Sequence, residues 1–195
     1  MSEPGRTRRG SGGPAGKKAQ EKGQTAAPPD PAQQAKDICY RLLTVRARTR
    51  LELEQALRSK GIPDDVAEST LGKFDRAGLI DDASFAETWV RSRHEYQGLG
   101  RRALKAELRR KGVTDDVAAE AVDMVDADAE EERARGLVRK KLRAMGAADE
   151  QTKVRRLVGM LARKGYSEGL SFRIVREELS YLDPETTLLD DTLIE

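Results

Sequence analysis

Hydrophobic positions from residue 38 onward recur at the three- and four-residue spacing that is typical of amphipathic helices. Ile38, Leu42 and Val45 form the first such face. Thr49 and Glu52 have the spacing of a capping box, which predicts that a helix begins there. Gly61 is the kind of residue that ends a helix. The pattern therefore predicts helices joined by short turns.

One ten-residue pattern occurs three times along the chain. Residues 57–66 (LRSKGIPDDV) match residues 108–117 (LRRKGVTDDV), and residues 161–170 (LARKGYSEGL) are a weaker copy. A period near fifty residues indicates stacked supersecondary units, and each copy has room for three helices. We therefore predict an all-α protein, an elongated and curved array of three tandem three-helix repeats. The predicted repeats cover residues 36–80, 81–126 and 127–183.

Both ends of the chain differ from this helical part. Residues 1–35 are rich in Gly and Pro, carry a charge of +3, and contain no Val, Ile, Leu, Phe, Trp or Tyr. Such a segment has almost nothing to bury, so we predict a disordered basic tail. We interpret it as a solvated leader rather than as an electrostatic arm for nucleic acid. Residues 184–195 are predicted to be an acidic C-terminal tail, although their leucines and Ile194 could dock elsewhere.

The third copy departs from the other two. Glu168 and Gly169 stand where the earlier copies have two aspartates, and Gly136 falls inside the first predicted helix of that copy. An interior glycine costs about 1 kcal/mol relative to alanine, so we expect this helix to bend or fray at Gly136.

Composition supports helices and excludes several classes of protein. Charged residues make up 36% of the chain and aromatic residues 4%, which fits amphipathic helices better than a β-sandwich or barrel. A single cysteine, Cys39, excludes an internal disulfide framework and fits a reducing compartment. No stretch is long and apolar enough for a membrane helix or a secretory signal, so we expect a soluble, cytoplasmic protein without a membrane partner.

No arrangement of residues indicates an enzyme, a metal site or a cofactor. The glycine-rich stretch 98–102 lacks the spacing of a phosphate-binding loop. His94 is the only histidine, and we expect it to be a solvated surface side chain. We interpret Cys39 as a small buried hydrophobe rather than a reactive thiol. The acidic run at 123–132 is expected to complement a helix dipole rather than to bind a cation.

The net charge of +2 conceals strong segregation. Residues 113–132 carry nine acids and no bases, residues 133–164 have a net charge of +9, and residues 165–195 have a net charge of −6. Basic residues also line up at helical spacing, and several such stripes on consecutive helices would form a positive track. A solvated face with ion pairs along each helix is the alternative for any single stripe. The candidate binding residues are Arg91, Arg93, Arg101, Arg102, Lys105, Arg109, Arg110, Lys111, Arg135, Arg139, Lys140, Arg143, Lys153 and Arg156.

The low aromatic content limits how such a track could bind. Phe85 and Trp89 are predicted to be core residues, which leaves Tyr96 as the main exposed aromatic. Proteins that bind single strands usually stack bases on several aromatic side chains. We therefore expect contacts to the backbone phosphates of single- or double-stranded DNA, without sequence preference, or to an acidic protein surface.

Several motifs together resemble the RecX family of bacterial regulators. They are residues 46–53 (RARTRLEL), 57–61 (LRSKG), 78–86 (GLIDDASFA), 90–93 (VRSR), 98–102 (GLGRR) and 107–113 (ELRRKGV). The resemblance covers about residues 36–182, and the combination is more specific than any one motif.

This resemblance implies an all-helical, curved protein of three-helix repeats that binds the recombinase RecA on DNA. It also implies a non-enzymatic regulator, most often an inhibitor, of the RecA filament. Inhibition would extend to ATP hydrolysis, strand exchange and the coprotease function, and so to recombination, DNA repair and the SOS response. We expect a monomer. A stand-alone, sequence-independent DNA-binding protein is the alternative, and it would bind bare DNA tightly with a steep dependence on salt.

Overall fold

The structure, a computed structural model, describes residues 30–146 and 148–181. Within these ranges it contains nine α-helices, one π-helical segment and no strand. The α-helices are α1 (Pro31–Val45), α2 (Arg50–Ser59), α3 (Asp64–Arg76), α4 (Asp82–Ser92), α5 (Arg101–Arg110), α6 (Asp115–Asp123), α7 (Ala127–Leu142), α8 (Glu150–Arg163) and α9 (Glu168–Ser180). The π-helical segment η1 (Arg93–Gln97) continues α4. The predicted all-α class is confirmed.

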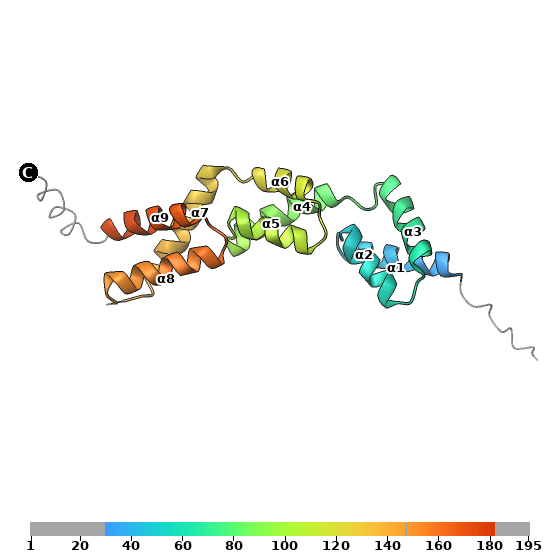
Figure 1. Ribbon diagram of the computed structural model, residues 1–195, viewed down its shortest axis with the longest axis horizontal. Helices are drawn as coiled ribbons and strands as arrows, with labels where there is room; N and C mark the ends of the chain where they lie inside the picture. The colour runs from blue at the N-terminus through green and yellow to red at the C-terminus, as the bar shows by residue number, and fades with distance from the viewer. Residues whose placement is uncertain (1–29, 147, 182–195) are drawn as a thin grey trace, which may run out of the picture.

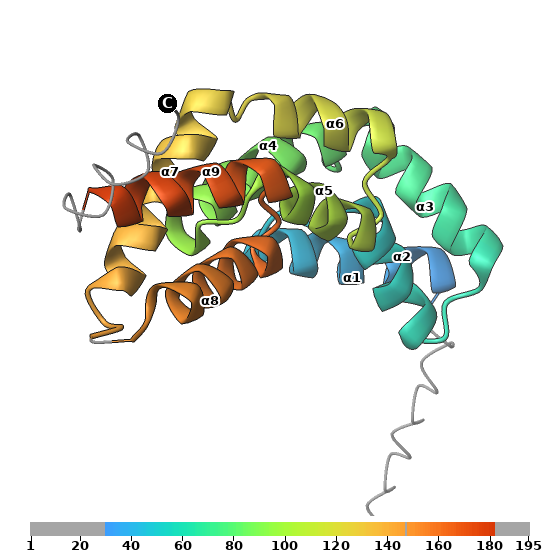
Figure 2. The same cartoon turned by 60° about the vertical axis from the view of Figure 1, so that its left-hand side comes forward.

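Consecutive helices pack in threes, and each set of three has its own hydrophobic core. Helices α1–α3 surround a cluster that includes Leu53, Leu57 and Leu71. Helices α4–α6 enclose Leu104 and Leu108 with their neighbours. Helices α7–α9 enclose a third cluster. The three sets follow one another along the long axis in Figure 1, and Figure 2 shows the same array turned by 60°. The predicted elongated, curved array is confirmed.

The same turn connects the second and third helices of every set. Gly61, Gly112 and Gly165 have φ values of 75°, 82° and 86°, a left-handed conformation that glycine adopts at little cost. In each turn the residue after the glycine donates its N–H to the carbonyl of a leucine five residues earlier, as in Ile62 to Leu57 at 3.2 Å. That residue is also buried in the core of its own set. The repeated ten-residue pattern thus encodes one repeated turn.

Helix α1 begins at Pro31, five residues earlier than the sequence predicted. The Asp30 side chain accepts a hydrogen bond from the Ala32 N–H at 3.1 Å, and Pro31 occupies the first turn, where its missing N–H costs nothing. Ala35 is fully buried. The helical part therefore begins at residue 30, inside the segment predicted to be a tail. The rest of that segment, and the predicted C-terminal tail, lie outside the described residues.

Helix α7 continues through Gly136 without a break, contrary to the expected fraying. Asp126 caps its beginning by accepting a hydrogen bond from Ala129, and Ala134, Val138 and Leu142 are buried along one side. Burial of this face and the cap offset the cost of one interior glycine.

Candidate interaction surface

The joints between the helical sets fix how the basic residues are arranged. At the first joint, the Thr49 hydroxyl donates to the Lys111 carbonyl at 2.7 Å. At the second joint, the Gly100 N–H donates to the Lys164 carbonyl at 2.8 Å. Thr49 and Gly100 both precede the second helix of their set, while Lys111 and Lys164 both belong to the lysine–glycine turn of the next set. Two successive joints therefore use the same docking arrangement.

A carboxylate from the following set reinforces each joint. The Arg50 N–H, at the start of α2, donates to Asp82 Oδ1 at 3.0 Å. The Arg101 N–H, at the start of α5, donates to Glu130 Oε1 at 2.9 Å. The first N–H groups of a helix have no partner within the helix, and a carboxylate there also complements the helix dipole. Each set is thus oriented by a helix start of the set before it.

Lys111 extends the first joint with its side chain. Its ammonium nitrogen lies 2.6 Å from Glu52 Oε1 and 4.2 Å from the centre of the Trp89 ring. Burial acts to raise the pKa of Glu52, but the hydrogen bonds from Arg46 and Lys111 outweigh it and hold that pKa below its usual value. Lys111, predicted to lie on the basic track, is engaged inside the protein.

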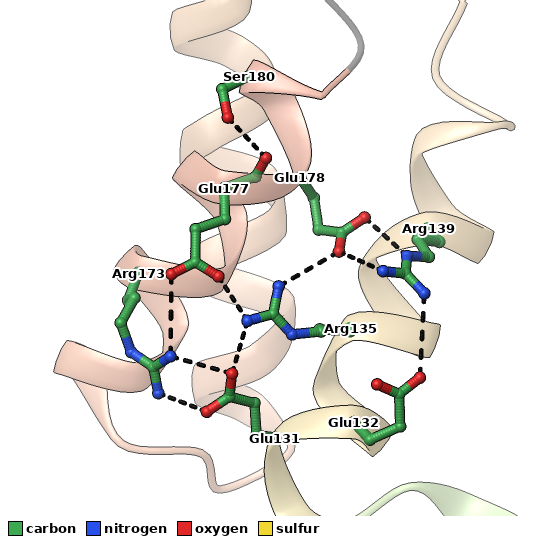
Figure 3. Close-up of polar contacts among 8 residues, drawn as sticks. All are labelled: Glu131, Glu132, Arg135, Arg139, Arg173, Glu177, Glu178 and Ser180. Atoms are coloured by element: carbon green, nitrogen blue, oxygen red, sulfur yellow. Dashed lines mark hydrogen bonds and ion pairs between the residues drawn. The ribbon is translucent and has the colours of Figure 1, made fainter. Parts of the chain in front are cut away.

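Two further predicted residues, Arg135 and Arg139, take part in an ion-pair network between α7 and α9 (Figure 3). The Arg139 side chain donates two hydrogen bonds to Glu178, at 2.8 and 2.9 Å. Arg135 contacts Glu131, Glu177 and Glu178. Glu178 is only 5% exposed. Arg135 and Arg139 of the third set are therefore neutralised by carboxylates of α7 and α9.

The network also shifts the pKa values of its charged groups. Hydrogen bonds from Arg173 and Arg135 lower the pKa of Glu131 from 4.5 to about 2. Hydrogen bonds to Glu131 and Glu177 raise the pKa of Arg135 above its usual range. Glu131 and Glu132 belong to the acidic run at 123–132, so this run serves ion pairs as well as the start of α7.

Three other predicted residues have a carboxylate partner nearby. Arg101 pairs with Asp123, and Arg109 pairs with Asp115. Arg93 lies 3.6 Å from Glu107 and stacks 4.2 Å from the centre of the Trp89 ring. These side chains retain some exposure, so their charges are shared between the protein and the solvent.

The remaining eight predicted residues have no ion pair within residues 30–146 and 148–181, and most of them are exposed. They are Arg91, Arg102, Lys105, Arg110, Lys140, Arg143, Lys153 and Arg156. Arg102 and Arg110 line a groove of about 720 Å³ between α5 and the α8–α9 turn, and Glu107 and Glu168 line it as well. The alanines Ala103, Ala106 and Ala162 contribute to its lining.

One basic residue that was not predicted from the sequence also lines this groove. Arg163 lines the same groove as Arg102 and Arg110. It occupies the position in the third copy of the ten-residue pattern that Arg110 occupies in the second. Aligning the copies would therefore have identified Arg163 as a candidate. What the sequence did not reveal is that one set's turn faces the preceding set's second helix.

The other candidate side chains are placed as follows. Cys39 is fully buried, as expected, and burial raises its pKa to about 11. His94 is half-buried rather than fully solvated, because it lies in η1 with Nδ1 2.9 Å from the Leu99 carbonyl oxygen. Tyr96 is exposed and Phe85 is buried, both as predicted. Trp89 is partly buried and donates to Glu107 at 2.8 Å.

No group of three or more His, Cys, Asp or Glu side chains in the described part of the chain is arranged to hold a metal ion. None of the helices in residues 30–146 and 148–181 has the length and apolar character needed to span a membrane.

Family models of RecX match the chain in all three sets. The first three-helix domain of RecX matches residues 35–74, the second residues 81–122 and the third residues 128–175. These domains correspond to the three sets α1–α3, α4–α6 and α7–α9.

Curated relatives and a solved structure agree with this match. "Regulatory protein RecX" of Amycolatopsis mediterranei is 57% identical over 168 residues, which cover 86% of this chain and 96% of the relative. The protein of the same name from Streptomyces coelicolor is 49% identical over 180 residues, covering 92% and 95%. The crystal structure of RecX from Lactobacillus salivarius superposes with a TM-score of 0.70 at 26% identity, covering 76% of this chain and 96% of that one. The chain therefore belongs to the RecX family of regulatory proteins.

Proposed function

We propose that this chain binds the recombinase RecA on DNA and inhibits RecA activities. The inhibited activities are ATP hydrolysis, strand exchange and the coprotease function, and the chain thereby modulates recombination and the SOS response. It acts as a cytoplasmic monomer, without catalysis of its own and without a cofactor. Family membership supports the regulatory role, and the resemblance of the sequence motifs to the RecX family implies RecA as the partner.

The observation that carries the proposal is the set of basic side chains with no ion pair in the described part of the chain. A paired arginine has already lost part of its attraction for a new anion, whereas an unpaired and exposed one has not. Arg102 and Arg110 meet this condition at the groove between the second and third domains, beside Arg163. Phosphates of DNA and carboxylates on RecA are the anions that such residues attract.

The elongated shape supports a long contact rather than a compact docking site. The three domains follow one another without folding back, and the described chain ends lie at opposite ends of the array (Figure 1). The repeated joints hold this shape with hydrogen bonds rather than with a flexible linker. A semi-rigid array of this kind suits a partner that is itself extended, such as a filament on DNA.

The direct test is RecA ATPase activity on single-stranded DNA with this protein titrated in. The proposal predicts inhibition, and inhibition at amounts well below those of RecA would favour a block of filament growth over one-to-one sequestration. An unchanged ATPase rate at an excess of the protein would contradict the proposal.

A second measurement separates this proposal from stand-alone DNA binding. The chain is added to labelled DNA with and without RecA, at several salt concentrations. Tight, strongly salt-dependent binding to bare DNA without any effect on RecA would favour the stand-alone alternative.

A further inference from the structure

A second groove lies at the joint between the first and second domains and includes none of the basic residues predicted from the sequence. It has a volume of about 360 Å³. One wall is the segment after α1, with Arg46 and Arg48, and the other is one side of α4, with Ser84, Thr88 and Ser92. Basic and hydroxyl side chains thus face the same space, together with the apolar side chains of Leu43, Leu79, Phe85 and Trp89.

Arg48 is the unusual residue in this groove. Its Nε atom is buried and has no hydrogen-bond partner, and the guanidinium forms no ion pair within residues 30–146 and 148–181. Its neighbour Arg46 differs, because it pairs with Glu52 at 3.0 Å. A partly buried cation without a partner is costly, and an anion bound beside it would remove much of that cost. Arg48 therefore points to an anionic ligand.

The three hydroxyl residues on α4 add a row of possible donors. Ser84, Thr88 and Ser92 are exposed and are spaced four residues apart, so they lie on one side of the helix. At about 1.5 Å of rise per residue, neighbouring members of the row are about 6 Å apart along the helix. Serine and threonine hydroxyls are regular donors to phosphate oxygens.

The ligand should make contacts with the residues of both walls of the groove. A single carboxylate would satisfy Arg48 but would leave most of the hydroxyl row unused. A chain of regularly spaced anions would satisfy both, and the phosphodiester backbone of a nucleic acid has this chemistry. Asp81 also lines the groove, but its Oδ1 already accepts a hydrogen bond from the Ser84 N–H at 2.8 Å.

We propose that the groove formed by Arg48 and by Ser84, Thr88 and Ser92 of α4 binds the phosphodiester backbone of a DNA strand. The inference rests on the proposed function, because it names the place where the regulator contacts DNA. The Arg102–Arg110–Arg163 groove, about one domain further along, is then available to the protein part of the filament.

The test measures binding of the full chain to a fluorescein-labelled oligo-dT strand by anisotropy across a range of salt concentrations. Arg48→Gln should weaken binding about tenfold and reduce the salt slope by about one counterion. Ser84→Ala combined with Thr88→Val should weaken binding while leaving the salt slope nearly unchanged, because no charge is removed. Arg76→Gln and Ser69→Ala, two exposed residues of α3, are the matched controls and should have little effect.

Circular dichroism melts of each variant check the fold, and the exposed hydroxyl variants keep the test valid if Arg48→Gln destabilises the protein. The site is wrong if the groove variants bind oligo-dT like the controls, or if poly-glutamate binds the wild type more tightly and loses affinity with Arg48→Gln. Failure of this site alone leaves RecA inhibition by the wild type intact. Failure of the proposed function would appear as an unchanged RecA ATPase rate.

Discussion

Gly165 lies so close to Ala103 that a β-carbon on the glycine would come within 2.3 Å of the Ala103 backbone nitrogen. Gly112 has the same relationship to Leu51, with a nearest approach of 2.4 Å. Each contact joins the turn of one domain to the second helix of the preceding domain. Glycine is thus required at these two positions for two reasons: the backbone has a positive φ, and the joint leaves no space for a β-carbon.

Gly165→Ala should therefore open the second joint, whereas Gly61→Ala serves as its control. Gly61 has a φ of +75° but no atom within 4 Å of its hypothetical β-carbon, so alanine there costs only backbone strain, about 1–2 kcal/mol. Gly165→Ala should cost roughly 1–3 kcal/mol more through overlap with Ala103. Urea unfolding measures the stability, and small-angle X-ray scattering measures the shape. Equal losses and unchanged scattering would show that the joint does not depend on this contact.

Glu178→Ala should destabilise the third domain. Glu178 is 5% exposed and accepts two hydrogen bonds from Arg139, so its removal leaves two guanidinium groups, those of Arg135 and Arg139, without their shared partner. We expect the melting temperature to fall by roughly 5 °C. Glu120→Ala, an exposed glutamate on α6, is the control. A drop no larger than that of the control would mean that the network contributes little.

The third domain should lose stability in acid because of Glu131. The folded protein holds the pKa of this carboxyl at about 2, below the value of 4.5 that it has without its partners. A depressed pKa contributes stability above the unfolded value, and that contribution is lost as the pH falls from about 4.5 towards 2. Thermal melts at a series of pH values should show this loss. Glu131→Gln should flatten the dependence, and an identical profile for the variant would contradict the assignment.

Cys39 should react slowly with thiol reagents in the native state. Burial raises its pKa from 9.0 to about 11, so at pH 8 the thiolate fraction is about a hundredfold smaller than for an ordinary thiol, and the side chain is also inaccessible. The rate of modification by a chromogenic disulfide, measured with increasing urea, should follow the opening of the first domain. Val45→Cys in a Cys39→Ser background provides an exposed thiol as the reference. Similar rates for the two thiols would contradict this account.

Much of the fold could be predicted from local sequence signals. The repeated lysine–glycine turn gave the number of units, because a left-handed glycine and a buried following residue are local properties. The core residues Leu57, Leu108 and Leu161 occupy equivalent positions in the three copies and are each fully buried. The start of α1 was placed too late, because Asp30 and Pro31 fall in a glycine- and proline-rich stretch that lacks large hydrophobic residues. The expected fraying at Gly136 was also wrong, because α7 is continuous there.

The candidate surface was harder to predict because ion pairing depends on residues far apart in the chain. Arg135 meets Glu177 and Glu178, more than forty positions later, only because α7 and α9 pack side by side. A stripe of arginines on α7 therefore looked available in sequence but is largely neutralised in the structure. Arg48 was passed over for the opposite reason, because nothing local distinguishes a paired arginine from an unpaired one.

The measurement that tests the central claim most directly is RecA ATPase inhibition by two charge-reversed triple variants. One carries Arg102→Glu, Arg110→Glu and Arg163→Glu at the groove, and the other carries Lys60→Glu, Lys73→Glu and Arg76→Glu on exposed positions of the first domain. Both change the net charge equally. We predict that the groove variant loses inhibition at moderate salt while the control variant retains most of it. Equal inhibition by both variants, with both still folded, would contradict the claim that this groove binds the filament.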